Sequence, residues 1–96
     1  MAKTKEVMQS VDFGGVKYSF PKRNRILFAK FENSSLAGAA YDIDSQELVI
    51  TFKSSIGVLY YAADVPQKVF LRMLDSDSVG AYFVKYVMTK YEFYTI

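Results

Sequence analysis

A short basic segment is the part of the sequence best suited to hold phosphate groups. Residues 22–25 read Lys-Arg-Asn-Arg, and further lysines lie a few residues to either side. Cations gathered in one loop neutralise phosphates and release counterions, which makes such binding strongly salt-dependent. A solvated surface loop is the alternative interpretation. The predicted nucleic-acid contacts in this segment are Lys17, Lys22, Arg23, Arg25 and Lys30.

Two adjacent tyrosines, Tyr60 and Tyr61, offer rings on which a nucleic-acid base could stack. Neighbouring residues of a strand face opposite sides of the sheet, so one ring must point away from the core unless both faces are covered. An exposed Tyr that stacks on a base contributes about 1–3 kcal/mol. The same ring can instead pack against a cross-strand neighbour. We predict that Tyr60 or Tyr61 completes the nucleic-acid surface.

A further aromatic group lies near the C-terminus, at Tyr82, Tyr86 and Phe93. Tyr82 and Tyr86 have helical spacing, and Tyr is common in protein interfaces because its ring is large while its hydroxyl can stay hydrated. The chain holds 8 Phe and 8 Tyr, more than the core of so small a domain easily accommodates. We therefore predict a protein interface at these three residues, with a broad core-facing stripe as the alternative.

The residue types exclude several kinds of catalytic and metal sites. The chain has no Cys and no His, so disulfides, Cys or His zinc sites and Ser–His nucleophile pairs cannot form. Asp42, Asp44 and Glu47 lie close together, but Glu47 stands where a calcium loop needs Gly, and an Asp that bonds its own turn is the simpler explanation. We expect no catalytic site, no metal site and no cofactor.

Length and composition indicate one small globular domain. The chain has 96 residues, of which 51% are hydrophobic and 23% are charged. The net charge of +2 is uneven: residues 1–30 hold seven Lys and Arg against two acids, and residues 31–96 hold five against eight. Such a difference can indicate an anionic partner for the first segment. With neither a signal peptide nor a membrane span, we expect no membrane association and a cytoplasmic location, in the host cytoplasm if the protein is viral.

Alternating apolar residues predict strands in the first two thirds of the chain. Residues 1–10 are polar and are expected to form a flexible tail. Gly14-Gly15 separates two alternating runs, which is typical of a hairpin with a type I′ turn. Residues 26–31 predict a short strand, and residues 36–61 predict a three-stranded antiparallel meander.

The pattern becomes helical towards the C-terminus. Asp64 is predicted to cap a helix over about 65–75, and Ser76 or Ser78 to cap a second helix over about 78–90.

Strands followed by helices are typical of an α+β fold. We predict a single domain over residues 11–96, in which the N-terminal hairpin and the meander form an antiparallel sheet. The two C-terminal helices are expected to cover one face of that sheet.

A series of short motifs runs through residues 35–91. In chain order they are Ser35-Leu36, Tyr41-Asp42, Leu48-x-Ile50-x-Phe52, Gly57-x-x-Tyr60, Asp64-Val65-Pro66, Ser78-x-Gly80-x-Tyr82-Phe83 and Tyr91. Together they resemble the KTSC domain family, which occurs at the C-terminus of some bacterial lysyl-tRNA synthetases and as stand-alone proteins of bacteria and phages. The resemblance implies RNA binding, which has been suggested for the family. It leaves residues 11–31 as an added hairpin and strand.

Three positions depart from the family pattern. The second Tyr of its central Tyr-x-Tyr is Ala62, the Asn that follows Tyr-Phe is Val84, and an expected Arg is Met88. We predict a small non-catalytic protein that binds RNA or single-stranded DNA through the basic loop and an exposed Tyr. The alternative is a protein-binding regulator, such as a phage-type inhibitor or adaptor, or a self-associating module that acts through its aromatic surface and forms homo-oligomers.

Overall fold

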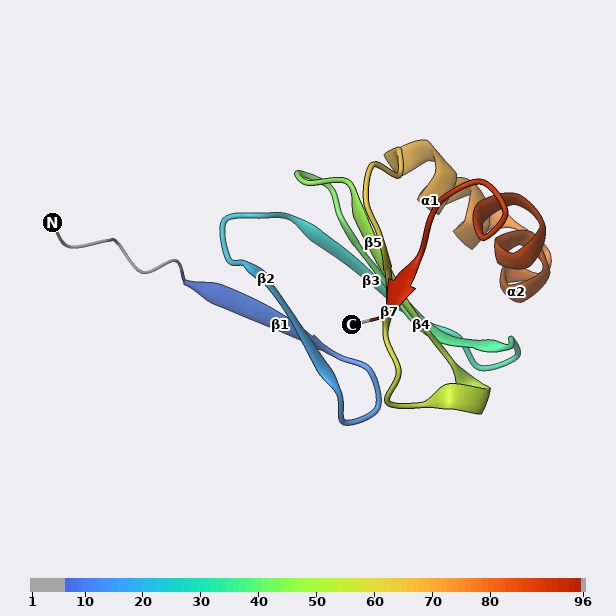
Figure 1. The fold of residues 1–96 in the computed structure, drawn as a ribbon, viewed down its shortest axis with the longest axis horizontal. Helices are drawn as coiled ribbons and strands as arrows, with labels where there is room; N and C mark the ends of the chain where they lie inside the picture. The colour runs from blue at the N-terminus through green and yellow to red at the C-terminus, as the bar shows by residue number, and fades with distance from the viewer. Residues whose placement is uncertain (1–6, 96) are drawn as a thin grey trace, which may run out of the picture.

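The structure, a computed structural model, describes residues 7–95 as two antiparallel sheets and a helical layer (Figure 1). The strands are β1 (Met8–Asp12), β2 (Lys17–Pro21), β3 (Ile26–Lys30), β4 (Leu36–Asp42), β5 (Glu47–Phe52), β6 (Tyr60–Ala62) and β7 (Tyr94–Thr95). The helical elements are a 3-10 turn η1 (Lys53–Ser55), α1 (Gln67–Asp75), α2 (Val79–Tyr82) and a π-helical segment η2 (Phe83–Val87). The predicted α+β class is confirmed.

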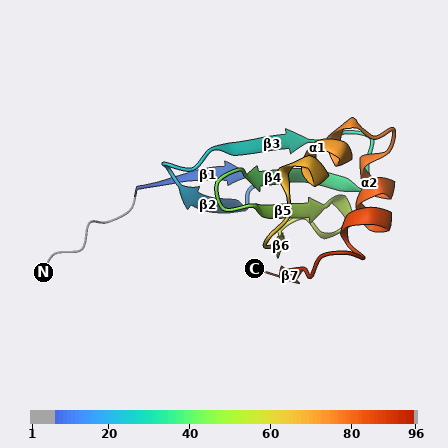
Figure 2. The same ribbon diagram turned by 90° about the horizontal axis from the view of Figure 1, so that it is seen from above.

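The main sheet has five strands in the order β3-β4-β5-β6-β7 (Figure 2). Strands β3 to β6 are neighbours both in the chain and in the sheet, which confirms the predicted strand at 26–31 and the predicted meander at 36–61. The chain then passes through the helices and returns to add the short strand β7 beside β6. Strands β3 and β7 therefore form the two edges of the sheet.

The N-terminal hairpin has the predicted turn but begins earlier than expected. Gly14 and Gly15 have φ values of 70° and 101°, and the amide of Phe13 donates to the carbonyl of Val16 over 2.7 Å. Positive φ at both central residues is what a type I′ turn requires. Strand β1 begins at Met8, inside the predicted tail, because its residues pair with β2 as far as Pro21. The rest of that predicted tail, residues 1–6, lies outside the described residues.

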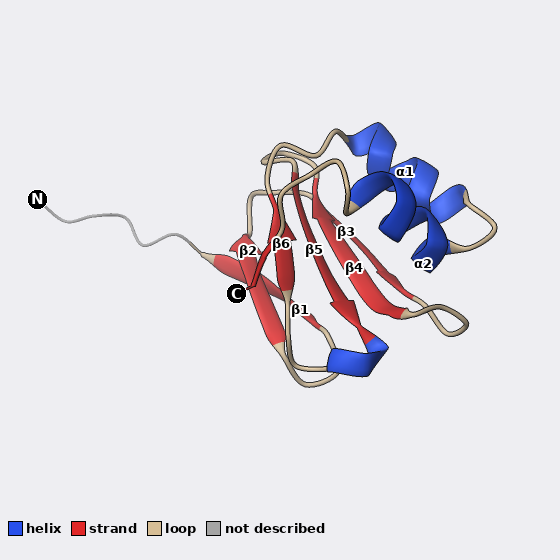
Figure 3. Cartoon of the chain, turned by 45° about the vertical axis from the view of Figure 1, so that its right-hand side comes forward, coloured by secondary structure: helices blue, strands red, loops and turns tan. Residues whose placement is uncertain are grey.

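The hairpin forms a sheet of its own instead of joining the main sheet, which corrects the prediction of one combined sheet. It packs against the face of the main sheet opposite the helices, as Figures 1 and 3 show. Phe13 and Phe20 are buried there against Ala40, Val49 and Leu59. Stacking on the sheet removes both Phe side chains from water, and burial of a large apolar side chain contributes about 1.5–3 kcal/mol.

The central strands of the main sheet are consequently buried on both faces. In β4 and β5, one set of side chains contacts the hairpin, and the alternate set contacts α1 and the segment α2–η2. Tyr41 of the second set stacks on Phe70 of α1 with ring centroids 5.2 Å apart, and its hydroxyl donates to the carbonyl of Val65 over 2.5 Å. The protein thus has three layers: hairpin, sheet and helices.

Small residues on β4 allow the hairpin to approach closely. A Cβ atom added to Gly38 would lie 3.4 Å from the ring of Phe13 and 3.2 Å from the carbonyl oxygen of Ala29. Ala40, two residues on, lies on the same face of the strand and is fully buried against the hairpin. A larger side chain at either position would hold the hairpin away from the sheet.

The helices begin differently from the sequence prediction. The predicted cap at Asp64 is wrong: this residue has a φ of 59°, and α1 begins after Pro66 with no side-chain cap. The next amide, that of Val65, donates to the carbonyl of Gln46 over 3.0 Å, so the approach to the helix is fixed by the β4–β5 turn. The predicted cap at Ser78 is confirmed, because its hydroxyl accepts from the amide of Ala81 over 3.3 Å.

Gly80 is the point at which α2 touches the turn before β4. A Cβ atom added there would overlap the Ser35 hydroxyl and lie 3.0 Å from that of Ser34. At an exposed position inside a helix, Gly→Ala would raise the free energy of unfolding by about 1 kcal/mol. Here the overlap dominates, and we expect Gly80→Ala to lower the free energy of unfolding by about 1–3 kcal/mol in urea denaturation.

Removal of the opposing hydroxyl should relieve this overlap. The double variant Ser35→Ala/Gly80→Ala is expected to recover part of the lost stability, since the Ser34 hydroxyl and the Ser35 backbone nitrogen would remain 3.0 and 3.3 Å from the added Cβ atom. Ser35→Ala alone should have a small effect because Ser35 is exposed. An unchanged stability in Gly80→Ala would contradict the close contact between α2 and this turn.

Candidate binding surfaces

The five predicted nucleic-acid cations do not form one group. Lys22, Arg23 and Arg25 lie in the loop between β2 and β3 and are exposed. Lys17 begins β2 and Lys30 ends β3, so each is separated from that loop by a five-residue strand. Such a strand spans about 13–17 Å. The structure therefore places Lys17 and Lys30 towards the Gly14–Gly15 turn and the other three cations at the opposite end of the hairpin.

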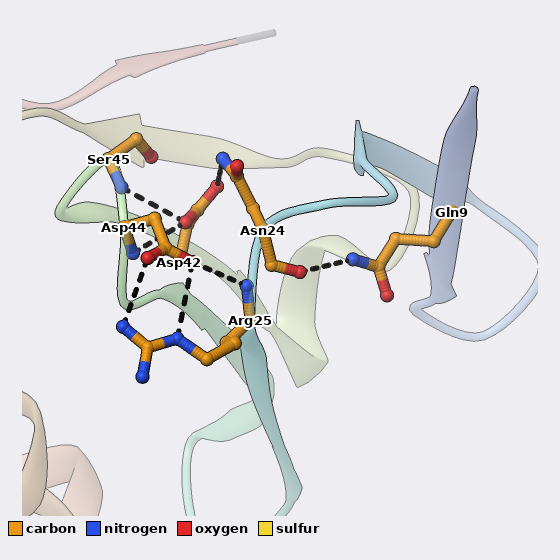
Figure 4. A network of polar contacts seen from close by, with 6 residues as sticks. All are labelled: Gln9, Asn24, Arg25, Asp42, Asp44 and Ser45. Atoms are coloured by element: carbon orange, nitrogen blue, oxygen red, sulfur yellow. Dashed lines mark hydrogen bonds and ion pairs between the residues drawn. The ribbon is translucent and has the colours of Figure 1, made fainter. Parts of the chain in front are cut away.

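The loop between β2 and β3 is held by a polar network, which Figure 4 shows. The side-chain amide of Gln9 donates to the carbonyl of Asn24 over 2.6 Å, and the Asn24 amide donates to Oδ2 of Asp42 over 2.8 Å. The other carboxylate oxygen of Asp42 accepts from the amides of Asp44 and Ser45 over 2.9 and 3.0 Å. This confirms the interpretation of Asp42 as a residue that bonds its own turn, and the fully buried carboxylate joins the hairpin connection to the β4–β5 turn.

Arg25 is bound to an acidic residue of the same turn. Its Nη2 lies 3.0 Å from Oδ1 of Asp44, and its backbone amide donates to Oδ2 over 2.7 Å. These hydrogen bonds hold the pKa of Asp44 below its usual range and raise the pKa of Arg25. The positive charge of Arg25 is thus opposed by a nearby carboxylate, and less of it is available to a phosphate.

Neither Tyr60 nor Tyr61 lies on an open face of the sheet. Tyr60 packs on the helix side, where its ring centroid is 5.6 Å from that of Phe52. Tyr61 packs on the hairpin side, and its hydroxyl forms a hydrogen bond with Glu47. That bond, together with partial burial, raises the pKa of Tyr61. Both rings are partly covered, Tyr60 by the core on the helix side and Tyr61 by the hairpin, which occupies the face that would otherwise be exposed.

Tyr82 and Tyr86 lie side by side, as their helical spacing predicts. Their ring centroids are 4.8 Å apart with an angle of 48° between the planes. The ammonium group of Lys85 is 5.3 Å from the centre of the Tyr86 ring, within the range of a cation–π contact. Tyr86 is 50% exposed, and Tyr82 is partly buried against the core. The pair therefore presents an aromatic surface with one positive charge.

Phe93 does not extend the Tyr82–Tyr86 pair but forms a wall of an apolar pocket. The pocket has a volume of about 250 Å³ and lies between the main sheet, η2 and the chain that leads to β7. Phe93 packs edge-on against Phe83 with ring centroids 5.2 Å apart. The lining residues of this C-terminal pocket are Ile50, Phe52, Tyr60, Phe83, Met88 and Phe93.

Of the six lining residues, only Tyr60 and Phe93 were predicted as site residues, and the four that sequence reasoning missed are Ile50, Phe52, Phe83 and Met88. Phe52 continues the alternation of Leu48 and Ile50, which indicates only that its side chain shares their face of the sheet. Met88 stands where the family pattern has an Arg. Its exposed fraction of 44% in a wall of the pocket indicates that it lies at the rim.

Within the described residues, no three acidic side chains are placed to hold a metal ion. None of the helices in residues 7–95 is long and apolar enough to cross a membrane.

The two acids of the β4–β5 turn should differ in their effect on stability. Asp42→Ala removes a buried carboxylate whose two oxygens accept three hydrogen bonds, and we expect a loss of about 2–4 kcal/mol in the free energy of unfolding measured in urea. Asp44→Ala is the control: its ion pair with Arg25 is exposed, so its loss should be much smaller. Equal losses would contradict the central role of Asp42.

The contact between Tyr61 and Glu47 can be tested by titration. The negative carboxylate of Glu47 opposes ionisation of the phenol, so Glu47→Gln should move the pKa of Tyr61 down towards its ordinary value. NMR of ¹³C-labelled tyrosine rings would follow each residue separately. Glu92→Gln serves as the control, since it should lower the pKa of Tyr94 and leave that of Tyr61 unchanged. An unshifted Tyr61 in Glu47→Gln would contradict this contact.

Comparisons with known proteins identify the family. The sequence matches the KTSC domain over residues 23–91, a range that includes β3 and follows the β1–β2 hairpin. A search of curated proteins found no match. The crystal structure of a KTSC domain protein from Yersinia pestis is similar to this fold, with a TM-score of 0.66 and 21% identity over 75% of this chain and 99% of that one. Since the match covers well over half of the sequence, this chain belongs to the KTSC domain family.

Proposed function

We propose that this protein is a non-catalytic protein-binding module whose C-terminal pocket receives an apolar side chain of a partner protein. The observation that carries this proposal is the pocket itself, a volume of about 250 Å³ whose lining is aromatic or aliphatic. Pockets for whole small-molecule ligands usually have volumes of about 300–1,000 Å³. The smaller volume suits a single anchor residue, which is how hot spots of protein interfaces commonly bind.

The surroundings of the pocket support this proposal. Met88 lies in its wall with 44% of its surface exposed, and the nearby segment η2 presents Tyr86, which is 50% exposed. Met adapts its shape to different partners, and Tyr is enriched in protein interfaces. A partner that inserts one side chain into the pocket could also cover these two residues.

The π-helical segment supports the same proposal. The amide of Met88 donates to the carbonyl of Phe83 over 2.8 Å, and this wider turn begins and ends at two residues that line the pocket. Short π-helical turns are rare and often lie at functional sites, where they shift side chains from regular helical positions.

A selection from a random peptide library displayed on phage would test the pocket. Binding of selected peptides should weaken at least tenfold in Met88→Ala and in Met88→Trp, which removes one wall or fills the space, and should change little with salt. Lys22→Ala is the matched control, because it changes an exposed residue of the distant β2–β3 loop and should leave affinity unchanged. Peptides that bind all three variants equally would contradict the proposal, and so would a selection without binders.

Binding of RNA or single-stranded DNA is the second candidate function. Lys22 and Arg23 are exposed in the β2–β3 loop, and the side chain of Arg25 remains accessible beside Asp44. Fluorescence anisotropy with labelled random RNA and DNA of about 20 nucleotides should then show affinity that falls at least tenfold between about 50 and 200 mM salt. At the lower salt concentration, the double variant Arg23→Ala/Arg25→Ala should bind the nucleic acid more weakly than the unchanged protein, whereas Met88→Ala should bind it equally well. Absence of binding at the lower salt would exclude this candidate.

A further inference from the structure

Strand β3 is an edge strand whose outer side is open within the described part of the chain. The carbonyl of Arg25 accepts from the amide of Ile43, and the amide of Phe31 donates to the carbonyl of Ala37. Antiparallel pairing alternates, so the odd-numbered residues of β3 bond to β4 and the even-numbered ones point outwards. The backbone groups of Ile26, Phe28 and Lys30 therefore face the open edge.

This edge lacks the usual protection against pairing. Proteins commonly protect an edge strand with central charges, Pro or a bulge. The centre of β3 is Leu27-Phe28-Ala29, and its one charged residue, Lys30, is at the end. Phe28 is 39% exposed at the middle of the strand, and its ring packs edge-on against Phe13 at 5.4 Å. An apolar strand with three outward-facing residues is thus available to another strand.

We propose that a second copy of this chain occupies the edge, with the two β3 strands antiparallel and Phe28 on the two-fold axis. Outward-facing residues must lie opposite each other, and this register pairs the greatest length of strand. It places Phe28 opposite Phe28 of the second copy and Ile26 opposite its Lys30. The alternate positions place Leu27 opposite Ala29. Apolar side chains therefore meet apolar side chains or the aliphatic stem of lysine, and no like charges lie opposite each other.

The charges beyond the ends of β3 support the antiparallel direction. The exposed acid Glu32 follows the strand, and the basic loop at 22–25 precedes it. In an antiparallel pair, Glu32 of each copy lies opposite Asn24 of the other, between the two arginines of that loop. A parallel pair would place the two basic loops beside each other, and their repulsion would oppose association.

The proposed dimer would leave the C-terminal pockets accessible. The pocket is formed partly by β6 and Phe93, towards the β7 side, and β3 is at the other edge of the sheet. Two copies would therefore carry their pockets at the two far sides of one continuous sheet. A partner with two anchor segments could bind both pockets, and such linked binding is stronger than either contact alone. This consequence rests on the proposed function, whereas the dimer itself does not.

Cysteine cross-linking tests the register of the two β3 strands. The chain contains no Cys, so an introduced Cys can form a disulfide only with the same Cys of the second copy. In the proposed pair, the Cα atoms at position 28 lie about 5.5 Å apart, within the range that a disulfide can bridge. Phe28→Cys should form a covalent dimer under mild oxidation at least tenfold faster than Ala29→Cys. Ala29 is the matched control, because it is on the same strand but lies opposite Leu27 of the other copy. Equal rates, or no dimer from Phe28→Cys, would overturn the proposal.

Sedimentation of the chain without introduced Cys provides the second measurement. A single strand pair is smaller than most stable interfaces, so dimers should be absent at about 10 µM and present at about 500 µM. Glu32→Lys should reduce the association constant several-fold, because it places a positive charge beside the basic loop of the other copy. Tyr86→Asp is the control: Tyr86 lies on the helix side, away from β3, so this variant should leave the association constant unchanged. A monomer at the higher concentration, or a dimer weakened by Tyr86→Asp and not by Glu32→Lys, would overturn the proposal.

Discussion

Burial of β4 and β5 on both faces is the constraint on which the other layers depend. One face of these strands provides the surface for the helices, and the other provides the surface for the hairpin. The second contact requires small residues, since Phe13 lies against Gly38 and Phe20 shares a buried cluster with Ala40. The hairpin is a small two-stranded sheet, and such a sheet has marginal stability by itself. Its order therefore depends on the apolar surface that the main sheet provides.

The same two-sided burial restricts where this protein can bind a partner. Both faces of the main sheet are occupied, so Tyr60 and Tyr61 line packed layers instead of an open platform. The surfaces that remain are the ends and edges of the layers: the C-terminal pocket, the aromatic pair on η2, the exposed cations and the outer side of β3. The proposed functions use these peripheral surfaces.

The elements of the fold were more predictable than the arrangement of the site. Alternation in residues 47–53 and the Gly14-Gly15 pair act through near neighbours, so the strand and the turn were correctly predicted. Asp64 failed as a cap because a tertiary hydrogen bond at the next residue fixes the chain before α1. The C-terminal pocket was missed as a site, since its walls come from β5, β6, η2 and the last segment, which no local pattern brings together.

The sequence by itself determined the fold class, the type of the first turn, the family motifs and the exclusion of Cys and His chemistry, because these depend on residue type and short spacing. Only the tertiary structure decided that the hairpin stacks on the sheet, that Arg25 pairs with Asp44 and that Lys17 and Lys30 lie away from the basic loop. The physical reason is that burial and charge pairing act between residues near in space. A sequence pattern indicates which side chains need partners, and the packing of layers decides which partners they find.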